Sequence, residues 1–560
     1  MDDRRCGSPH ADGNGVTFAG PIFDHSKVAI IDEFLRSGLP LTNPFFYKAG
    51  SSTSLPYYYL WHFSAAEIGR LTGASAWEAD VAMTWFTSFS SLHIVMGLAF
   101  WISRSYRACF GAIAVCATAS LRPYIGQLFG YDVAYDLTGY PTGFGAWLFQ
   151  AAWAPQHIQS AGCSVVALLM IARVGCNRYL PSVTLGLVVA AAYASSFWVG
   201  GIVLPIQLAL AFIVMLQAGE STPIRLVWSL SLAAAVAVVF ASPLIVEQAL
   251  AMSARQGGFP ISFSSVMVLG DVIPEWSRPV LDPLAFYLVY LTVELQVCYV
   301  IGLPMLARLV GARSAHLGRR HQVLVLAAAV VVSLLATGFL SSTVTANNDL
   351  GWRAVLPAVL ILVAISGAGM AAAIRQRVTI RRVLMFAVFL LAAFQAVLVL
   401  SSNLFPTPTG SGREFTGSIE LWRDVRSVSS PLQRVVNNPD YLGKVTPWPV
   451  NISWALLSNR RSCYAARNLV EALVPLPREE LDEIDALFRR VFTQGPESGD
   501  VRRLAFEFGC EIAIVTVDDP IWPIDPFAEN LTYELVVARR DRWRIYRRRN
   551  ESMPSSTAPP

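Results

Sequence analysis

The chain of 560 residues is 54% hydrophobic and only 15% charged, and its mean hydropathy is +0.47. Soluble globular proteins carry about 25% charged residues, so this composition excludes one and indicates a polytopic membrane protein. The 43 basic and 39 acidic residues give a net charge of +4, which is too close to balance to indicate a nucleic-acid partner.

The first eighty residues contain neither a spanning run nor a signal peptide. Apolar residues recur at helical spacing at Ile30, Ile31, Phe34 and Leu35 and predict a short helix. Asp24 stands at the N-terminal end of that helix. Asp24 is then either a general base or the N-cap of that helix. We expect residues 1–80 to be an extracytoplasmic segment with interfacial helices, and we expect that an upstream spanning helix is missing.

An aromatic cluster follows this helix, made of Tyr57, Tyr58, Tyr59, Trp61 and His62. It precedes a moderately apolar helix. Such rings are typical of the headgroup depth of a membrane, and they also suit a rim that grips a sugar or a lipid-linked ligand.

The predicted fold is a membrane all-α polytopic bundle of about ten spanning helices over residues 81–402, because apolar runs of roughly 18 residues match the hydrocarbon thickness of a bilayer. The runs lie near 81–103, 108–121, 157–173, 183–197, 198–218, 226–246, 284–307, 323–342, 354–374 and 383–402. Glu294 falls within one of them and is expected to face the bundle interior.

Arginines are distributed unevenly between the two sets of loops, and short loops rich in Lys and Arg stay in the cytoplasm. One set holds Arg104, Arg107, Arg173, Arg178, Arg225, Arg308, Arg313, Arg319, Arg320, Arg375, Arg377, Arg381 and Arg382, whereas the other holds only Arg122, Arg255, Arg278 and Arg353. This asymmetry places the loops 122–156, 247–283 and 343–353 outside, together with everything after about residue 402. Lysine occurs only at Lys27, Lys48 and Lys444, a hint of a GC-rich bacterial genome.

Two external loops carry polar candidates. The first holds Asp132 and Asp136 among aromatics and glycines, followed by His157. Acids and aromatics together suit carbohydrate, although the two acids also fit a solvated helix face and His157 a helix cap.

The last external loop within the bundle holds Asn347, Asn348 and Asp349 before Arg353. An arginine at an outer membrane boundary needs a partner, which is either Asp349 or a phosphate.

Residues 403–550 return to soluble composition and predict an extracytoplasmic α/β domain. We expect a helix over 479–491 and strands over 510–517, 533–538 and 543–546, followed by a disordered tail over 551–560. Cys463 and Cys510 both lie in this domain, and an oxidising compartment would permit a disulfide between them. The other cysteines form neither a CxxC pair nor a Cys/His cluster at ligand spacing.

Together these features resemble the GT-C superfamily of membrane glycosyltransferases, which use polyprenyl-phosphate sugars on the outer face. The resemblance rests on the acid and helix of PIFDHSKVAIIDEFLRSGLP, on the stretch from Pro56 to Tyr59 and on a small external domain that ends in a strand. It also rests on Arg353 and Pro357, which keep the spacing of the family's Arg-Tyr-x-x-Pro motif, although the tyrosine of that motif is absent here. His25 stands where an acidic partner is common in the family.

The resemblance implies transfer of a sugar from a polyprenyl-phosphate donor to an extracytoplasmic glycan, lipid or protein acceptor, with inversion. Asp24 would be the general base and Arg353 the ligand of the donor phosphate. The implied substrate-binding residues are His25, Tyr57, Tyr58, Tyr59, His62, Asp132, Asp136, His157, Asn348 and Asp349. The two external acids orient the acceptor or, in members that need one, help to bind a divalent cation.

The resemblance also implies a bacterial inner membrane location, with the lipid bilayer and a lipid-linked sugar as partners. Two other functions remain open at this point. A transporter or flippase predicts internal repeats and charges or helix breaks at mid-membrane. A non-catalytic envelope scaffold or sensor predicts that the loss of Asp24 is harmless.

Overall fold

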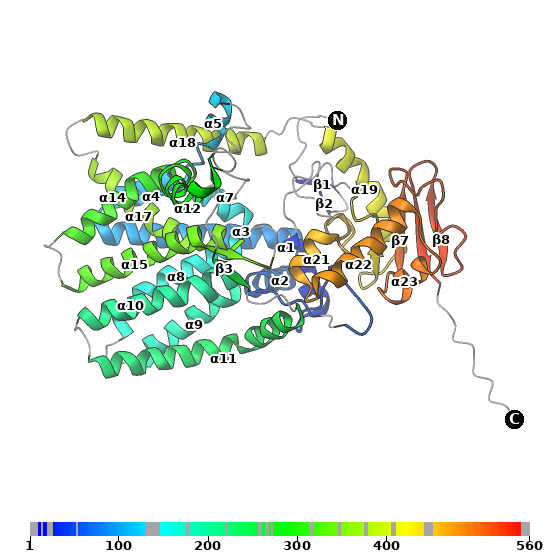
Figure 1. Ribbon diagram of the computed structural model, residues 1–560, viewed down its shortest axis with the longest axis horizontal. Coiled ribbons are helices and arrows are strands. Elements are labelled where there is room, and N and C mark those ends of the chain that lie inside the picture. The colour runs from blue at the N-terminus through cyan, green and yellow to red at the C-terminus, as the bar shows by residue number, and fades with distance from the viewer. Residues whose placement is uncertain are drawn as a thin grey trace.

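The computed structural model describes most of the chain, namely residues 9–12, 15–18, 26–51, 54–129, 146–174, 179–218, 222–255, 260–263, 268–269, 273–312, 317–344, 349–373, 379–404, 410–441 and 452–549. A helical bundle forms one part and a domain with a mixed sheet forms the other (Figure 1). The N-terminal helices lie between them.

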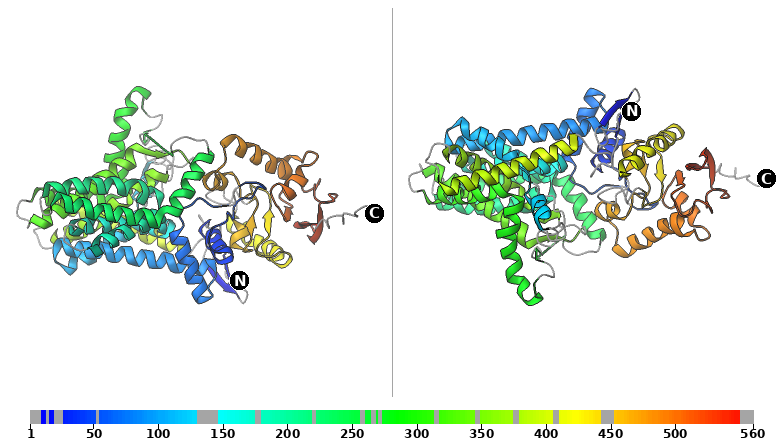
Figure 2. Two further views of the ribbon diagram at one scale, coloured as in Figure 1. Left: turned by 90° about the horizontal axis from the view of Figure 1, so that it is seen from below. Right: turned by 90° about the horizontal axis from the view of Figure 1, so that it is seen from above.

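The bundle consists of long apolar helices that run side by side (Figures 1 and 2). They are α3 (Ala76–Ser103), α4 (Tyr106–Cys116), α8 (Pro155–Val174), α9 (Tyr179–Ser195), α10 (Leu204–Ala218), α11 (Pro223–Arg255), α14 (Gln296–Gly311), α15 (Leu317–Phe339), α17 (Leu356–Ala373) and α18 (Ile380–Leu404). Helix α17 is apolar all round and almost entirely buried, as expected of a central helix. By contrast, α11 and α18 expose large apolar side chains such as Phe240 and Phe394, which is typical of a surface that faces lipid.

Five helices in the described part of the chain are long and apolar enough to cross a membrane, or six if one bent pair counts as a span. The protein is therefore a membrane protein, as predicted, but the predicted count of about ten spans is not confirmed. The difference arises partly because runs that looked continuous in sequence form shorter helices. The run at 108–121, for instance, yields only the 11 residues of α4.

The predicted span at 284–307 is not one straight helix. It consists of α12 (Arg278–Ala285), the π-helical turn η5 (Phe286–Tyr290), α13 (Leu291–Glu294) and α14, and the axis bends by 117° at the break after Glu294. Glu294 is buried at this bend, as predicted. The Ser120 hydroxyl and the Arg122 guanidinium lie beside it, so the carboxyl group has polar neighbours inside the bundle.

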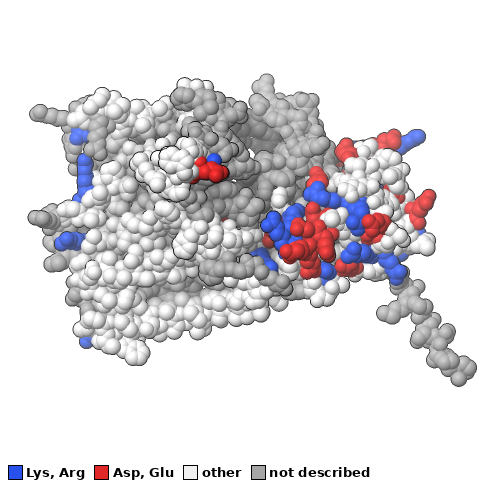
Figure 3. All heavy atoms as spheres, in the orientation of Figure 1, with Lys and Arg blue, Asp and Glu red and all other residues white. Residues whose placement is uncertain are grey.

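Arginines gather at one end of the bundle. Figure 3 shows basic side chains along the end that lies farthest from the sheet domain. Helix α11 gives the direction, because Arg255 at its C-terminal end donates to the carbonyl of Ala472 in the sheet domain at 2.7 Å. Its other end, with Arg225, is 30 residues away, or about 45 Å at 1.5 Å per residue.

The N-terminal helices α1 (Ser26–Ser37) and α2 (Leu60–Thr72) pack against each other and against α3. The predicted stripe is confirmed: Ile30, Ile31 and Phe34 are buried. These side chains share one hydrophobic core with Trp422 and Ile512 of the sheet domain. The segment before the bundle is therefore built into the interface between the bundle and the sheet domain.

Polar contacts reinforce this interface. The Arg461 guanidinium donates to the Glu33 carboxylate, with Nε 2.8 Å from Oε2. Arg434 is buried and donates to the carbonyls of Asn43 and Ser462 at 2.9 and 2.7 Å. The loop after α1 is thus held by the sheet domain, and α1 is held in turn against the bundle.

The remaining short elements connect these parts. They are β1 (Pro9–Asp12), β2 (Gly15–Phe18), α5 (Arg122–Phe129), α7 (Ala146–Trp153), η2 (Phe197–Val203), β3 (Ile261–Phe263), η4 (Glu275–Ser277), β4 (Leu340–Ser342) and α16 (Asp349–Ala354). β1 pairs with β2, and β3 pairs with β4, each in antiparallel register.

The C-terminal sheet has the strand order β6-β5-β7-β9-β8. Its strands are β5 (Arg434–Val436), β6 (Arg461–Ser462), β7 (Ile512–Thr516), β8 (Tyr533–Arg539) and β9 (Trp543–Arg548). β5 is parallel to β6 and β7, and β9 is antiparallel to β7 and β8. The three strands predicted from sequence are therefore confirmed as β7, β8 and β9.

Helices cover this sheet. They are α19 (Gly410–Val428), α20 (Ser453–Leu456), α21 (Arg467–Leu473), α22 (Arg478–Arg489), the π-helical turn η6 (Arg490–Gln494) and α23 (Asp500–Phe506). The predicted helix at 479–491 is confirmed as α22 with its continuation into η6. Leu481, Ile484 and Phe488 of α22 enter the core because they recur on one face.

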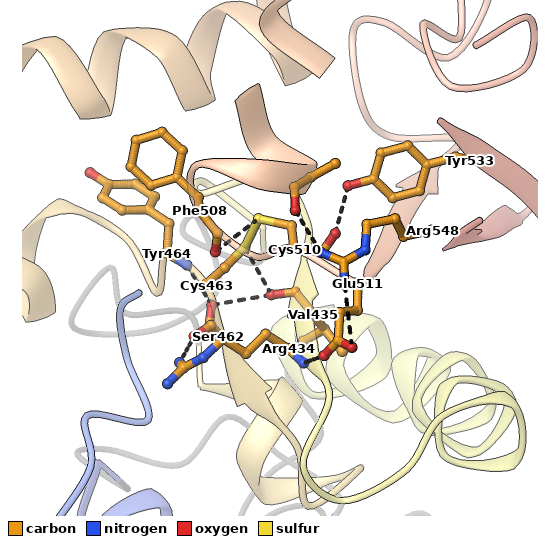
Figure 4. The surroundings of a disulfide bond; sticks show 11 residues. Arg434, Val435, Ser462, Cys463, Tyr464, Phe508, Cys510, Glu511, Tyr533 and Arg548 are labelled. Atoms are coloured by element: carbon orange, nitrogen blue, oxygen red, sulfur yellow. Dashed lines mark hydrogen bonds and ion pairs between the residues drawn. A yellow bond between two sulfur atoms is a disulfide. The ribbon is translucent and has the colours of Figure 1, made fainter. Parts of the chain in front are cut away.

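Cys463 and Cys510 form a disulfide, with their Cα atoms 5.5 Å apart (Figure 4). Cys463 follows β6 and Cys510 precedes β7, so the bond joins two strands on either side of β5. The Tyr533 hydroxyl donates to the Cys510 carbonyl at 2.7 Å. The bond that the sequence permitted is therefore present.

Candidate functional site

Buried and half-buried polar side chains gather at the end of the bundle that adjoins α1 and α2. They come from α1, the segment before α2, α2 itself, α7, α8 and α16, most of which lie far apart in the sequence. The cluster contains Lys27, Tyr57, Tyr58, His62, Gln150, Trp153, His157, Asp349 and Arg353.

Arg353 lies in α16 and is 4% exposed. Its Nη1 donates to Oε1 of Gln150 at 2.8 Å, and its guanidinium lies 4.5 Å from the centre of the Trp153 ring. Asp349 is a distant ion-pair partner, with Oδ1 3.7 Å from Nη2. The Nε of Arg353 is buried and has no hydrogen-bond partner among the described residues. The pairing with Asp349 therefore exists, but it leaves part of this cation uncompensated.

Lys27 is a second buried cation that contacts Trp153. Its Nζ donates to the Trp153 carbonyl at 3.2 Å and lies 3.7 Å from Oδ1 of Asp80 in α3. One tryptophan thus carries Arg353 against its ring and Lys27 on its carbonyl. Both carboxylates lie within ion-pair distance of the cations but beyond hydrogen-bond distance, so the two ion pairs are loose.

His157 is buried in the first turn of α8 and connects the aromatic segment to the bundle. Its Nδ1 lies 2.7 Å from Oγ of Ser196, and its Nε2 lies 3.4 Å from the Tyr58 hydroxyl. Burial raises the pKa of Tyr58 well above its usual value, with Tyr57 and Asp349 adding to the effect. The Tyr58 hydroxyl therefore keeps its proton, and the His157 ring joins it to the Ser196 hydroxyl through its two nitrogens.

His62 is fully buried in α2. Burial and the neighbouring Lys27 lower its pKa to about 3, so the ring is neutral at physiological pH. Neither ring nitrogen has a hydrogen-bond partner among the described residues. The ring contacts Tyr57 edge-on, with centroids 5.6 Å apart, and Tyr57 stacks on Tyr58 at 4.1 Å.

The predicted site residues are distributed as follows. Arg353, Asp349, Tyr57, Tyr58, His62 and His157 come together in this cluster. Tyr59 instead packs edge-on against Phe34 of α1, with centroids 5.6 Å apart, and forms part of the core there. Asp24, His25, Asp132, Asp136 and Asn348 lie outside the described residues.

Three cluster members were not singled out from the sequence: Lys27, Gln150 and Trp153. Lys27 carried a signal, because it is one of three lysines in the chain and stands three residues after Asp24. Gln150 and Trp153 carried none beyond their place in an aromatic-rich loop. No group of three or more metal-ligating side chains occurs within the described part of the chain.

Comparison with known proteins places the chain in a family. The family model of the Y4nK C-terminal Rossmann-like domain matches residues 411–547. The uncharacterized protein y4nK of Sinorhizobium fredii is 31% identical over 569 residues, an alignment that covers 96% of this chain and 82% of the relative. The chain belongs to the Y4nK family.

This Y4nK-family chain is similar in structure to GT-C glycosyltransferases. The arabinofuranosyltransferase AftD from mycobacteria matches with a TM-score of 0.52 and 14% sequence identity, over 94% of this chain and 38% of AftD. ArnT from Cupriavidus metallidurans, in a structure bound to undecaprenyl phosphate, matches with a TM-score of 0.49 and 14% identity, over 94% of each chain. The resemblance to the GT-C superfamily is therefore confirmed at the level of the fold.

Proposed function

We propose that this protein transfers a sugar from a polyprenyl-phosphate donor to an extracytoplasmic acceptor, with inversion at the anomeric carbon. The observation that carries the proposal is the incomplete neutralisation of Arg353. Its polar contacts among the described residues are the neutral Gln150 amide at 2.8 Å and the Asp349 carboxylate at 3.7 Å. A buried guanidinium with a spare N–H suits a phosphate, whose oxygens accept in a bidentate geometry.

Arg353 and Lys27 together act on the donor in this proposal. As the bond between the anomeric carbon and the phosphate oxygen breaks, negative charge grows on the departing polyprenyl phosphate. Two cations held by contacts with Trp153, one with its ring and one with its carbonyl, stabilise that charge without having to move. Burial strengthens the interaction because little water screens it.

Asp24 is the proposed general base. It removes the proton of the acceptor hydroxyl as the oxygen attacks the anomeric carbon from the face opposite the phosphate. Support comes from its position three residues before Lys27 in the sequence. Tyr57, Tyr58, Tyr59, His62, His157 and Asp349 are proposed to line the substrate site, and His25, Asp132, Asp136 and Asn348 remain proposed substrate residues, the two acids also for a divalent cation.

The proposed location is the bacterial inner membrane, with the sheet domain in the periplasm. The arginine-bearing helix ends lie opposite the sheet domain, which supports this orientation through the positive-inside tendency. The Cys463–Cys510 disulfide supports it as well, because disulfides persist in oxidising compartments. The proposed division is an N-terminal segment 1–80, a bundle 81–402, a domain 403–550 and a tail 551–560.

The test is transfer of radiolabelled sugar from synthetic polyprenyl-phosphate sugars by the purified full-length protein. Asp24→Asn is expected to abolish transfer while expression and membrane insertion stay unchanged. Glu275→Gln is the matched control, because its carboxylate side chain is 89% exposed and lies outside the cluster. Full activity of Asp24→Asn would exclude the base assignment.

A flippase is the second candidate, and the bend after Glu294 favours it, since discontinuous helices with a buried carboxyl group are typical of transporters. The same preparation in vesicles separates the two functions. A flippase would move labelled lipid between leaflets without forming a glycosidic product, and Glu294→Gln would impair it while Asp24→Asn would not.

A further inference from the structure

A second site lies at the end of the bundle opposite the Arg353 cluster. A cavity of about 830 Å³ opens between α14, α17 and α18. Helix α17 starts next to Arg353 and reaches the cavity in its last turns, at Gly369, Ala372 and Ala373. With 1.5 Å per residue, the cavity lies about 25 Å from the Arg353 cluster.

Helix packing creates this space. At Gly302, α14 touches α17 so closely that a Cβ atom would meet the Leu362 carbonyl at 2.8 Å. Seven residues after Leu362, or about two helical turns further along α17, Gly369 has only ordinary contacts with α14, the nearest being Ile301 at 3.4 Å and Met305 at 3.8 Å. The two helices therefore separate toward the arginine-rich end, and α18 forms the third wall.

The side chains that line the cavity are apolar except for those of Arg308, Thr379 and Arg382. Its walls include Val300, Ile301, Met305, Leu384, Met385 and Val388. Leu384 is 60% exposed, and Ile380, which also lines the cavity, is 76% exposed. The cavity thus opens on an apolar outer face of the bundle, the kind of surface that meets acyl chains.

Two arginines line the cavity at the arginine-rich end of the bundle. Arg308 belongs to the last turn of α14 and Arg382 to the first turn of α18, and both line the cavity. An apolar cleft that ends in two guanidinium groups is complementary to a molecule with a hydrocarbon part and an anionic head. Free phosphate would leave the apolar walls unused, and a neutral lipid would offer no negative charge to the two guanidinium groups.

We propose that this cavity binds an anionic phospholipid from the leaflet at the arginine-rich end, with the headgroup phosphate between Arg308 and Arg382 and an acyl chain along α14 and α18. The volume is within the range of about 300–1,000 Å³ that is usual for ligand sites. The site is separate from the proposed donor site in both position and leaflet.

The test is native mass spectrometry of the full-length protein with phosphatidylglycerol and phosphatidylcholine at equal concentrations. The wild type is expected to retain one phosphatidylglycerol in preference to phosphatidylcholine. Arg308→Gln and Arg382→Gln should each weaken that binding about fivefold, as one cation near an anionic headgroup contributes. Arg225→Gln is the matched control, because it removes an exposed arginine at the same end of the bundle but outside the cavity.

A second variant tests the apolar part with both arginines intact. Gly369→Leu directs a side chain into the cavity and should abolish lipid retention, whereas Gly369→Ala should leave it unchanged because its Cβ meets only ordinary contacts. Equal retention of the two lipids, or retention unaffected by the arginine variants and by Gly369→Leu, would overturn the proposal. Displacement of the bound lipid by inorganic phosphate alone would also overturn it, since the apolar walls would then contribute nothing.

Discussion

Replacing Arg353 by glutamine should damage donor use far more than it damages the fold. The substitution removes the positive charge and the contact of the guanidinium with Trp153 at 4.5 Å. It also removes the donor to Gln150 at 2.8 Å. Cation–π contacts contribute about 1 kcal/mol, and relief of the unpartnered Nε offsets part of that loss. We therefore expect the free energy of unfolding to change by no more than about 1 kcal/mol.

The effect on the reaction is larger. Removing one member of a buried charge pair costs roughly 2–5 kcal/mol, because the remaining ion stays buried without its partner. In the proposed reaction that ion is the donor phosphate. The cost corresponds to a fall in kcat/KM for the donor of about 30-fold to several thousand-fold. Arg353→Lys keeps the positive charge but loses the planar guanidinium group, so its kcat/KM should lie between those of the wild type and Arg353→Gln.

The assay is the initial rate of sugar transfer over a series of donor concentrations, with thermal unfolding measured on the same samples. Arg225→Gln serves as the control, because this exposed arginine lies at the far end of α11. An unchanged donor KM and kcat in Arg353→Gln would refute the phosphate role. A large loss of thermal stability would refute the claim that Arg353 is available for a ligand, since it would mean that the fold itself depends on the charge.

Three further predictions concern the fold. Burial raises the pKa of Asp32 in α1 from 3.8 to about 7. Between these two values the folded state binds a proton that the unfolded state has lost, so the free energy of unfolding falls as pH rises from about 4 to 7. Asp32→Asn should remove this decline, which amounts to up to about 4 kcal/mol, when unfolding is measured across that pH range. Gly367→Ala places a Cβ atom 2.4 Å from a backbone nitrogen of α4 and should destabilise the bundle by about 1–3 kcal/mol. The control Gly97→Ala should leave stability unchanged, because nothing lies within 4 Å of its Cβ position. Equal melting temperatures of the two variants would contradict the close approach of α17 to α4. Cysteines introduced at Arg540 and Arg225 should react with impermeant maleimide from opposite sides of the membrane, and labelling from one side would overturn the topology.

Periodicity made parts of the fold predictable. The stripe of α1, the amphipathic α22 and the three strands β7, β8 and β9 each follow from residues that are neighbours in sequence. Span count was less accessible, because helix breaks such as the 117° bend after Glu294 depend on what packs beside the chain rather than on its hydropathy.

The candidate site was predictable only where a residue conflicted with its surroundings. Arg353 stood out because an arginine at an outer membrane boundary is costly without a partner. Gln150 and Trp153 conflict with nothing locally, so no pattern identified them. Their importance arises because the folded chain brings α16 to α7, so that atoms of residues 203 positions apart lie 2.8 Å from each other.

The sequence alone determined that this is a membrane protein, which of its loops are rich in arginine, and that a soluble α/β domain follows the bundle, because hydropathy and charge act locally along the chain. Tertiary structure decided which polar groups meet. It brought both Lys27 and Arg353 into contact with Trp153, turned Tyr59 toward Phe34, and separated α14 from α17 at the far end. These contacts depend on packing between helices that are far apart in the sequence. A glycine or a single buried charge determines the distance between two such helices, and no local sequence pattern shows this.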